Sequence, residues 1–200
     1  GQKKISQATV TVVGIGGLGC PAASILAASG VGKIILIDGD KIELSNLHRQ
    51  PIYGIEDVGM LKVSVASFQL SKNYNQVNIE PVAEFINEEN GKIFLQGSDV
   101  IIDATDNYKS RAVIDSVSKE FSIPMVYGGL YRFEGQVSIF NVNGSPGYAE
   151  LFPDKPLGGV ACEDAGVVSM LPGIIGNIQA LETLKLIVGT EPTLIGKILI

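Results

Sequence analysis

The chain has 200 residues, of which 46% are hydrophobic and 18% charged, and it carries a formal net charge of −6 at pH 7. This balance excludes a disordered chain and indicates one domain with a sizeable core, while the acidic charge and scattered basic residues argue against a nucleic-acid partner. Two cysteines, Cys20 and Cys162, are too few for a disulfide framework. Neither a leader sequence nor an apolar run of about 18 residues is recognisable, so we expect a cytoplasmic protein that does not bind a membrane.

The chain opens with the elements of a nucleotide-binding unit. An apolar, β-branched strand is predicted over Val10–Val13 and is followed by glycines at positions 14, 16, 17 and 19. A helix over Pro21–Ser29 and a strand over Lys33–Ile37 then lead to Asp38. Glycines let the backbone approach phosphate oxygens, and an acid at the end of the second strand can accept hydrogen bonds from ribose hydroxyls. This order predicts a mononucleotide-binding βαβ unit; the alternative is a glycine-rich turn that serves only packing.

Residues 39–50 are polar and lack a hydrophobic period, which predicts a loop with at most a short helical turn. His48, the only histidine of the chain, is expected to be a surface residue rather than a base. An amphipathic helix is predicted over Gly59–Asn73, with Phe68 among its inward residues. Lys62 falls in the first turn, where the helix dipole disfavours a cation unless both face an anion such as a polyphosphate. A solvated surface lysine is the alternative.

Acidic and amide side chains follow the predicted strand Asp99–Asp103. In open α/β sheets ligands bind beyond the carboxyl ends of the strands, so Asp103, Asp106 and Asn107 are expected at the edge that carries the glycine turn. The carboxylate of Asp106 is a suitable oxygen ligand for Mg²⁺ beside phosphates. The alternative is that this stretch caps a helix over Ser110–Phe121, and neighbouring residues can hold both roles.

The rest of the sequence continues the alternation of strands and helices. Further strands are predicted over 77–82, 124–130, 135–142 and 194–200, and further helices over 87–96 and 167–188. We therefore predict an α/β, Rossmann-like doubly wound sheet, mostly parallel with antiparallel strands in the C-terminal half. In this interpretation residues 1–200 form one domain, with a nucleotide-binding core (1–142), a crossover loop that contains Cys162 (143–165), and a C-terminal helix and strand (166–200).

Five ordered motifs, spread over nearly the whole chain, resemble those of one family. The motifs are Gly14–Gly19, Asp38–Asp40 with Leu44–Gln50, Gly59–Lys62, Asp103–Asn107, and Ala161–Val167 with Gly176–Glu182. They are similar to the motifs of the ubiquitin-activating-like adenylyltransferases, which charge sulfur-carrier proteins in molybdopterin and thiamine synthesis or activate ubiquitin-like modifiers. The resemblance implies that the C-terminal carboxylate of a small carrier protein ending in Gly-Gly attacks the α-phosphate of ATP, giving an acyl-adenylate and pyrophosphate. It also implies a homodimer.

The resemblance implies catalytic roles for several side chains. Arg49 and Lys62 would neutralise charge that develops on the phosphates, and Asp106 would hold Mg²⁺. Cys162 would accept the activated carboxylate as a thioester or take part in sulfur transfer, although some members of the family adenylate without it. Arg111 corresponds to an arginine of the family, and a surface position on its helix is the alternative.

A second group of residues is expected to bind the nucleotide. Gly17 would allow the close approach of the phosphates, and Asp38 would hold the ribose. Asn46 and Asn107 would position other groups of the nucleotide, beside Arg49, Lys62 and Asp106.

The sequence departs from the family in two places. Many members carry a Cys-x-x-Cys zinc half-site before a Leu-Phe-Pro, where this chain has Gly147 and Glu150 before Leu151–Pro153. Because glycine has no ligand atom and one glutamate cannot close a tetrahedral site, we expect no structural zinc. The family often supplies an arginine from a segment before the first strand, and here that segment is absent. One hypothesis is that the ends of the chain are trimmed relative to a natural protein.

Two other classes of function remain as alternatives. A nicotinamide-dependent oxidoreductase would also need the glycine turn and Asp38, but hydride transfer needs no clamp of Arg49, Lys62 and Asp106 around a metal-bound triphosphate. A non-catalytic scaffold could keep the fold and lose the chemistry, which the presence of these three residues disfavours.

Overall fold

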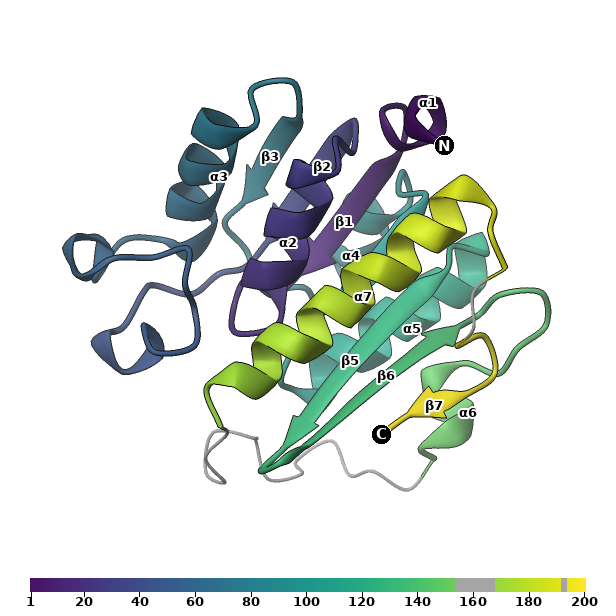
Figure 1. Ribbon diagram of the computed structural model, residues 1–200. Helices are drawn as coiled ribbons and strands as arrows, with labels where there is room; N and C mark the ends of the chain where they lie inside the picture. The colour runs from purple at the N-terminus through teal and green to yellow at the C-terminus, as the bar shows by residue number, and fades with distance from the viewer. Residues whose placement is uncertain (154–167, 192–193) are drawn as a thin grey trace.

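The computed structural model describes residues 1–153, 168–191 and 194–200. Within these residues the chain forms a seven-stranded sheet in the order β3-β2-β1-β4-β5-β6-β7 (Figure 1). The parallel part comprises β1 (Thr9–Val13), β2 (Lys33–Ile37), β3 (Asn78–Val82), β4 (Val100–Asp103) and β5 (Met125–Tyr131). The antiparallel part adds β6 (Glu134–Phe140) and β7 (Ile198–Leu199). The predicted fold class is therefore confirmed.

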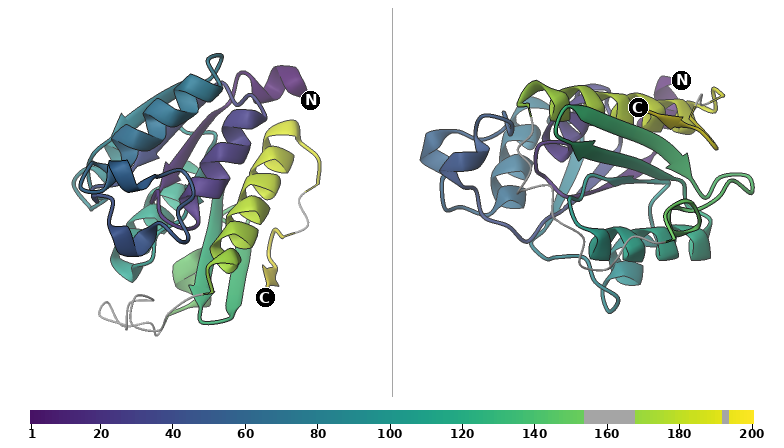
Figure 2. Two further views of the ribbon diagram at one scale, coloured as in Figure 1. Left: turned by 60° about the vertical axis from the view of Figure 1, so that its left-hand side comes forward. Right: turned by 90° about the horizontal axis from the view of Figure 1, so that it is seen from below.

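Helices cover both faces of the sheet (Figures 1 and 2). One face carries α2 (Gly19–Ala28), α3 (Lys62–Asn73) and α7 (Met170–Val188), and the other carries α4 (Gly91–Leu95), α5 (Tyr108–Phe121) and α6 (Tyr148–Leu151). A short helix, α1 (Gln2–Ile5), precedes β1, and single 3-10 turns lie at Leu44–Asn46 and Ile55–Asp57. This is the two-sided arrangement expected when right-handed crossovers connect parallel strands.

Each face of the sheet has its own hydrophobic core because side chains alternate along the strands. In β1, Val10 and Val12 belong to the core beneath α2, α3 and α7, whereas Val13 belongs to the core beneath α4 and α5. All three valines are almost completely buried. Thr11 is also completely buried, and its hydroxyl is hydrogen-bonded to that of Ser98 (2.6 Å), so β1 is buried on both faces of the sheet.

Helix α7 is 19 residues long and, by length and composition alone, apolar enough to cross a membrane. The expectation that no segment reaches this length is therefore wrong. One such helix is weak evidence for a membrane span, and α7 lies along β5 and β6 beside α2 (Figure 1). The buried amide of Gln179 donates hydrogen bonds to the carbonyls of Asp103 (2.8 Å) and Val126 (3.0 Å), which ties α7 to β4 and β5.

Three local expectations were wrong. Phe68 is 65% exposed, because α3 buries the opposite side that carries Val63, Val65 and Leu70. The helix predicted over 87–96 is reduced to α4, since side chains of Asn87 and Asn90 hold the preceding residues in a hydrogen-bonded turn. The long loop predicted over 143–165 contains the short helix α6.

Candidate active site

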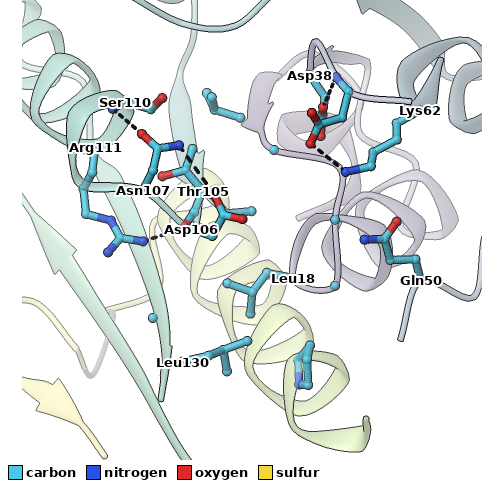
Figure 3. A pocket seen from close by; sticks show the side chains of 18 of the residues that line it. Leu18, Asp38, Gln50, Lys62, Thr105, Asp106, Asn107, Ser110, Arg111 and Leu130 are labelled. Carbon is cyan, nitrogen blue, oxygen red and sulfur yellow. Dashed lines mark hydrogen bonds and ion pairs between the residues drawn. The ribbon is translucent and has the colours of Figure 1, made fainter. Parts of the chain in front are cut away.

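A cavity of about 630 Å³ opens at the carboxyl ends of the parallel strands. After β1 the chain turns to α2 on one face, and after β4 it turns to α5 on the other, so the two connections diverge between neighbouring strands. Such a switch point is where open α/β sheets bind ligands. Figure 3 shows the side chains that line the cavity. Among them are all the nucleotide-binding residues expected from the sequence: Gly17, Asp38, Asn46, Arg49, Lys62, Asp106 and Asn107.

Two glycines of the turn between β1 and α2, Gly14 and Gly17, border the end of β4 and the cavity, and a side chain at either would be crowded. Gly14 has a φ of +90°, and a Cβ at this residue would lie 2.6 Å from the carbonyl oxygen of Ala104. At Gly17 a Cβ would lie 3.0 Å from that of Pro172 and 3.6 Å from Cδ of Arg49. Glycine is therefore needed both to pack β1 against the end of β4 and to keep this wall of the cavity open.

Asp38 is built into the turn as a buried acceptor. Its Oδ2 accepts a hydrogen bond from the backbone N–H of Ile15 (2.7 Å), and its Oδ1 accepts one from that of Asp40 (2.8 Å). Burial raises the pKa of the carboxyl group, although nearby Lys62 and both backbone donors act in the other direction. The side chain still lines the cavity, in the position expected of a ribose acceptor.

Lys62 is the first residue of α3, and its side chain is only 8% exposed. Its Nζ lies 2.9 Å from Oδ2 of Asp40. Burial by itself would lower the pKa of the ammonium group, but Asp38, Asp40 and Asp106 together raise it. The alternative of a solvated surface lysine is therefore wrong, and the ammonium group, whose pKa is raised, lines the cavity.

Arg49 follows the 3-10 turn Leu44–Asn46 and is oriented by that turn. Its guanidinium donates to the side-chain oxygen of Asn46 (3.0 Å) and to the carbonyl of Ser45 (3.3 Å). The expected loop thus contains one helical turn that brings Arg49 and Asn46 together. His48 has an exposed side chain at the rim of the same cavity, in agreement with the expectation of a surface residue.

In the loop after β4, Asn107 and Asp106 have different roles: one caps a helix and the other faces the cavity. Asn107 caps α5, since its side chain accepts a hydrogen bond from the backbone N–H of Ser110 (2.9 Å). Asp106 is exposed to the cavity and contributes to the raised pKa of Lys62. Its Oδ1 accepts a long hydrogen bond from the side-chain amide of Asn107 (3.5 Å). The carboxylate has the hard oxygens that Mg²⁺ prefers and is exposed, so this residue fits a role in holding the ion.

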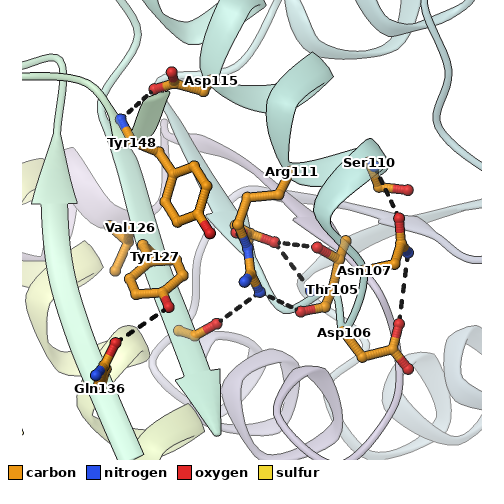
Figure 4. A network of polar contacts seen from close by, with 12 residues as sticks. Thr105, Asp106, Asn107, Ser110, Arg111, Asp115, Val126, Tyr127, Gln136 and Tyr148 are labelled. Carbon is orange, nitrogen blue, oxygen red and sulfur yellow. Dashed lines mark hydrogen bonds and ion pairs between the residues drawn. The ribbon is translucent and has the colours of Figure 1, made fainter. Parts of the chain in front are cut away.

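Asp103 ends β4 opposite Val13, at the edge of the sheet where it was expected, but its side chain does not line the cavity. It is fully buried, and its carboxylate accepts hydrogen bonds from the backbone and hydroxyl of Thr105 and from Nε of Arg111 (2.7 Å). Figure 4 shows Arg111 directed toward the loop that carries Thr105. The guanidinium also donates to the carbonyls of Thr105 and Gly128 and lies over the ring of Tyr127. Arg111 is 9% exposed, so the alternative of a surface residue is wrong. This pair fixes the loop that presents Asp106.

The sequence did not indicate two parts of the cavity wall. One is the loop after β3, where Glu84 and Phe85 lie at the cavity and the ring of Phe85 packs on Gly39. The other is formed by the ends of β5 and β6, including Leu130 and Gln136. The first part follows a strand and the second lies at the ends of two strands of the same sheet, and this position was the only signal that could have identified them.

The segment that replaces the family's zinc half-site is held without thiolates. Oδ1 of Asp115 on α5 accepts a hydrogen bond from the backbone N–H of Tyr148 (2.8 Å), and Oδ2 accepts one from that of Ala149 (3.0 Å), as Figure 4 shows for Tyr148. The side chain of Glu150 is paired with Lys119 (2.6 Å). Because both carboxylates are already engaged and Gly147 has no side chain, the donor set of this segment does not fit zinc.

Of the two cysteines, Cys20 lies within the described residues. Cys20 is completely buried at the start of α2, and this burial raises the pKa of its thiol to about 12. It is an unreactive packing residue, as expected. Cys162 lies outside the described residues.

Comparisons with known proteins identify the family of the chain. The whole chain, residues 1–200, matches the ThiF family. It is 37% identical to the sulfur carrier protein adenylyltransferase of Thermus thermophilus, with all of this chain and 76% of that protein aligned. The chain belongs to the ThiF family. This ThiF-family chain is also 40% identical to the adenylyltransferase and sulfurtransferase MOCS3 of Anopheles gambiae, and 41% identical to the SAMP-activating enzyme E1 of Haloferax volcanii.

The lengths of these relatives differ from that of the chain. It spans 46% of the Anopheles MOCS3 protein and 74% of the Haloferax enzyme. Among solved structures, PaaA aligns with 98% of this ThiF-family chain at a TM-score of 0.82 and 30% identity, over 61% of its own length. MccB of E. coli has a TM-score of 0.87 at 23% identity over 98% of this chain and 60% of its own, which shows a shared fold.

Proposed function

We propose that this ThiF-family chain uses ATP to adenylate the C-terminal carboxylate of a small ubiquitin-like or sulfur-carrier protein, releasing pyrophosphate. The relatives named as adenylyltransferases and as an activating enzyme support this class of reaction. The observation that carries the proposal is one cavity that combines a glycine turn, Asp38, two cations and the exposed carboxylate of Asp106. A nicotinamide enzyme would need neither the cations nor that carboxylate.

The nucleotide half of the proposal follows the positions of the side chains. Asp38 accepts hydrogen bonds from the ribose, and the backbone around Gly17 approaches the phosphates. Asn46 and Asn107 position neighbouring groups of the nucleotide. Arg49 reaches the same part of the cavity, since its Cδ lies 3.6 Å from the position of a Cβ at Gly17.

In the reaction, a carboxylate oxygen of the carrier protein attacks the α-phosphorus of ATP. The bond from that phosphorus to the bridging oxygen breaks, and the electron pair leaves with pyrophosphate. Negative charge grows on the phosphate oxygens, where Arg49 and Lys62 stabilise it. Mg²⁺, held at Asp106, would supply further charge compensation. Because Lys62 is fixed and charged beforehand, little reorganisation is needed at the moment of reaction.

The carrier half of the proposal rests on the ends of β5 and β6. The cavity that contains Asp106 is also lined by Gly129, Leu130 and Gln136, and Gly129 has no side chain to obstruct an extended tail there. A tail ending in Gly-Gly suits such a space, because glycines add no side chains that the cavity would have to accommodate beside the reacting carboxylate. We propose that the carrier presents its carboxylate from this side.

Further parts of the proposal concern the assembled protein. We propose a cytoplasmic homodimer that acts in molybdopterin or thiamine synthesis or on a protein modifier; two-fold dimers are the commonest closed assemblies. Light scattering that gives a monomer mass would contradict the dimer. Cys162 is proposed for a transfer step after adenylation, so Cys162→Ser should retain adenylate formation. An adduct between carrier and enzyme that persists in Cys162→Ser would show that this role is wrong.

The test of function is exchange of labelled pyrophosphate into ATP. The tagged chain is used to capture small proteins from its own source, and a captured protein ending in Gly-Gly is then added to the exchange reaction. We expect exchange that requires this protein and is lost when its last glycine is removed. Tight NADH binding by a chain that does not bind ATP would favour the oxidoreductase and contradict the proposal.

A further inference from the structure

Gln50 lies in the wall of the cavity and has no role in the function proposed above. Its side chain is 2% exposed, although glutamine is usually found at the surface. A buried amide destabilises the fold unless its polar atoms form hydrogen bonds. Within the described part of the chain, the side-chain oxygen of Gln50 accepts none. The hydrogen bonds of its side-chain nitrogen therefore indicate what Gln50 does.

The nitrogen of Gln50 is part of a relay to Arg49. Nε2 of Gln50 donates to Oδ1 of Asn46 (3.1 Å), and the same oxygen accepts a hydrogen bond from Nη2 of Arg49 (3.0 Å). A guanidinium has only donors, so the Asn46 atom that faces it must be the oxygen. The Gln50 atom that faces this oxygen must then be the nitrogen. The N–H donors of Arg49 thus determine which way both side-chain amides are oriented.

The other end of the relay is anchored on the glycine turn. The backbone N–H of Tyr53 donates to the carbonyl of Gln50 (3.2 Å), and the buried hydroxyl of Tyr53 donates to the carbonyl of Ile15 (2.9 Å). Nε2 of Gln50 lies 3.6 Å from the position of a Cβ at Gly16. Gln50 is therefore fixed against the glycine turn. The side chain of Arg49 is partly exposed and, besides Asn46, contacts the carbonyl of Ser45 (3.3 Å) in the same exposed turn.

We propose that Gln50 is a positioning residue, which holds Arg49 toward the phosphates of ATP through Asn46. The proposal rests on the function given above, because it assumes that the glycine turn and Arg49 act on one phosphate chain. Without the relay, the long side chain of Arg49 would sample more rotamers and spend less time at the phosphates. Gln50 itself touches neither substrate in this arrangement, so its loss should affect only ligands on which Arg49 acts.

The experiment compares ATP with adenosine as ligands of the full chain, by calorimetry. Gln50→Met keeps the length and volume of the side chain and removes the donor. We expect the Kd of ATP to rise about tenfold and that of adenosine to change less than twofold. Gln96→Met is the matched control, because Gln96 is exposed at the end of α4, away from the cavity, and should change neither Kd.

A double-variant cycle with Arg49→Ala tests the route of the effect. If Gln50 acts through Arg49, then Gln50→Met should add less than twofold to the Kd of ATP in the Arg49→Ala background. Additive losses would overturn the proposal, as would equal weakening of ATP and adenosine. Should Gln50→Met fail to fold, Gln50→Leu takes its place with the same expectations. A wild-type chain that does not bind ATP at all would instead contradict the proposed function.

Discussion

The ammonium group of Lys62 lies 2.9 Å from Oδ2 of Asp40, so an acidic residue of the chain itself holds this cation in the cavity. The two residues are far apart in sequence and meet because α3 begins directly beside the loop after β2. Asp40 is half exposed, whereas Lys62 is nearly buried. Phosphate oxygens entering the cavity would therefore find a lysine whose position and charge are already fixed.

Lys62→Ala should nearly abolish adenylate formation while the fold remains intact. Preorganised charges of this kind typically contribute about 2.7–4 kcal/mol to transition-state stabilisation, which corresponds to a loss of roughly 10²–10³-fold. Pyrophosphate exchange and thermal unfolding should be measured together. Lys72→Ala, at the exposed end of the same helix, is the control. Unchanged exchange in a folded Lys62→Ala variant would remove this residue from the site.

Asp106→Ala should make turnover very slow and insensitive to Mg²⁺, because its carboxylate is proposed to hold the ion. Exchange rates would be measured over a range of Mg²⁺ concentrations at constant ATP. The side chain is exposed and does not anchor its loop, which Asp103 and Arg111 hold, so stability should change little. An ordinary Mg²⁺ dependence at a near-normal rate would contradict the assignment.

Asp115→Ala should destabilise the fold by about 3 kcal/mol, since the variant loses charged hydrogen bonds to Tyr148 and Ala149 and leaves both N–H groups unpaired. Urea unfolding measures the difference. Glu150→Ala removes an exposed ion pair from the same segment and serves as the control, with little change expected. Adding a zinc chelator to the wild type should leave its midpoint unchanged. A marked fall would show that a metal, and not Asp115, holds this segment.

Cys20 should resist thiol reagents in the native protein. Its pKa of about 12 keeps the thiol protonated, so labelling of a Cys162→Ser variant should stay negligible from pH 7 to 9 and become rapid in denaturant. Between the ordinary thiol pKa and about 12 the folded state binds one more proton than the unfolded state. Stability should therefore fall as the pH rises through this window. Fast native labelling that follows an ordinary thiol titration would show that Cys20 is accessible.

The order of the elements and most of the site could be predicted because local patterns determine them. The apolar run of β1, the glycine spacing and the acid after β2 each have one straightforward structural interpretation. Lys62 could be placed in the cavity because a cation at a helix start is unfavourable without an anion. Parallel strands bring these positions to one edge of the sheet.

Features that depend on distant partners could not be predicted. Whether Arg111 is exposed is decided by Asp103 and by the rings of β5 and α6, and nothing within its own helix indicates this. Phe68 fits an apolar helical stripe but falls outside the surface that β2 and β3 cover. Gln50 also gave no signal, since a glutamine in a polar loop has no pattern that reveals burial.

The position of α7 determines how the protein can be divided. Pro172 at its start closes against Gly17, Gly176 lies on the carbonyl of Leu18, and Gln179 joins β4 to β5. The glycine turn near the start of the chain therefore takes its final shape from a helix about 150 residues later. A fragment that ends before Pro172 would contain every residue expected to bind the nucleotide. It would still lack one wall of the cavity that these residues line. Truncation to the first 153 residues should thus yield a chain without the binding site, and co-expression with the missing helix is the appropriate way to restore it.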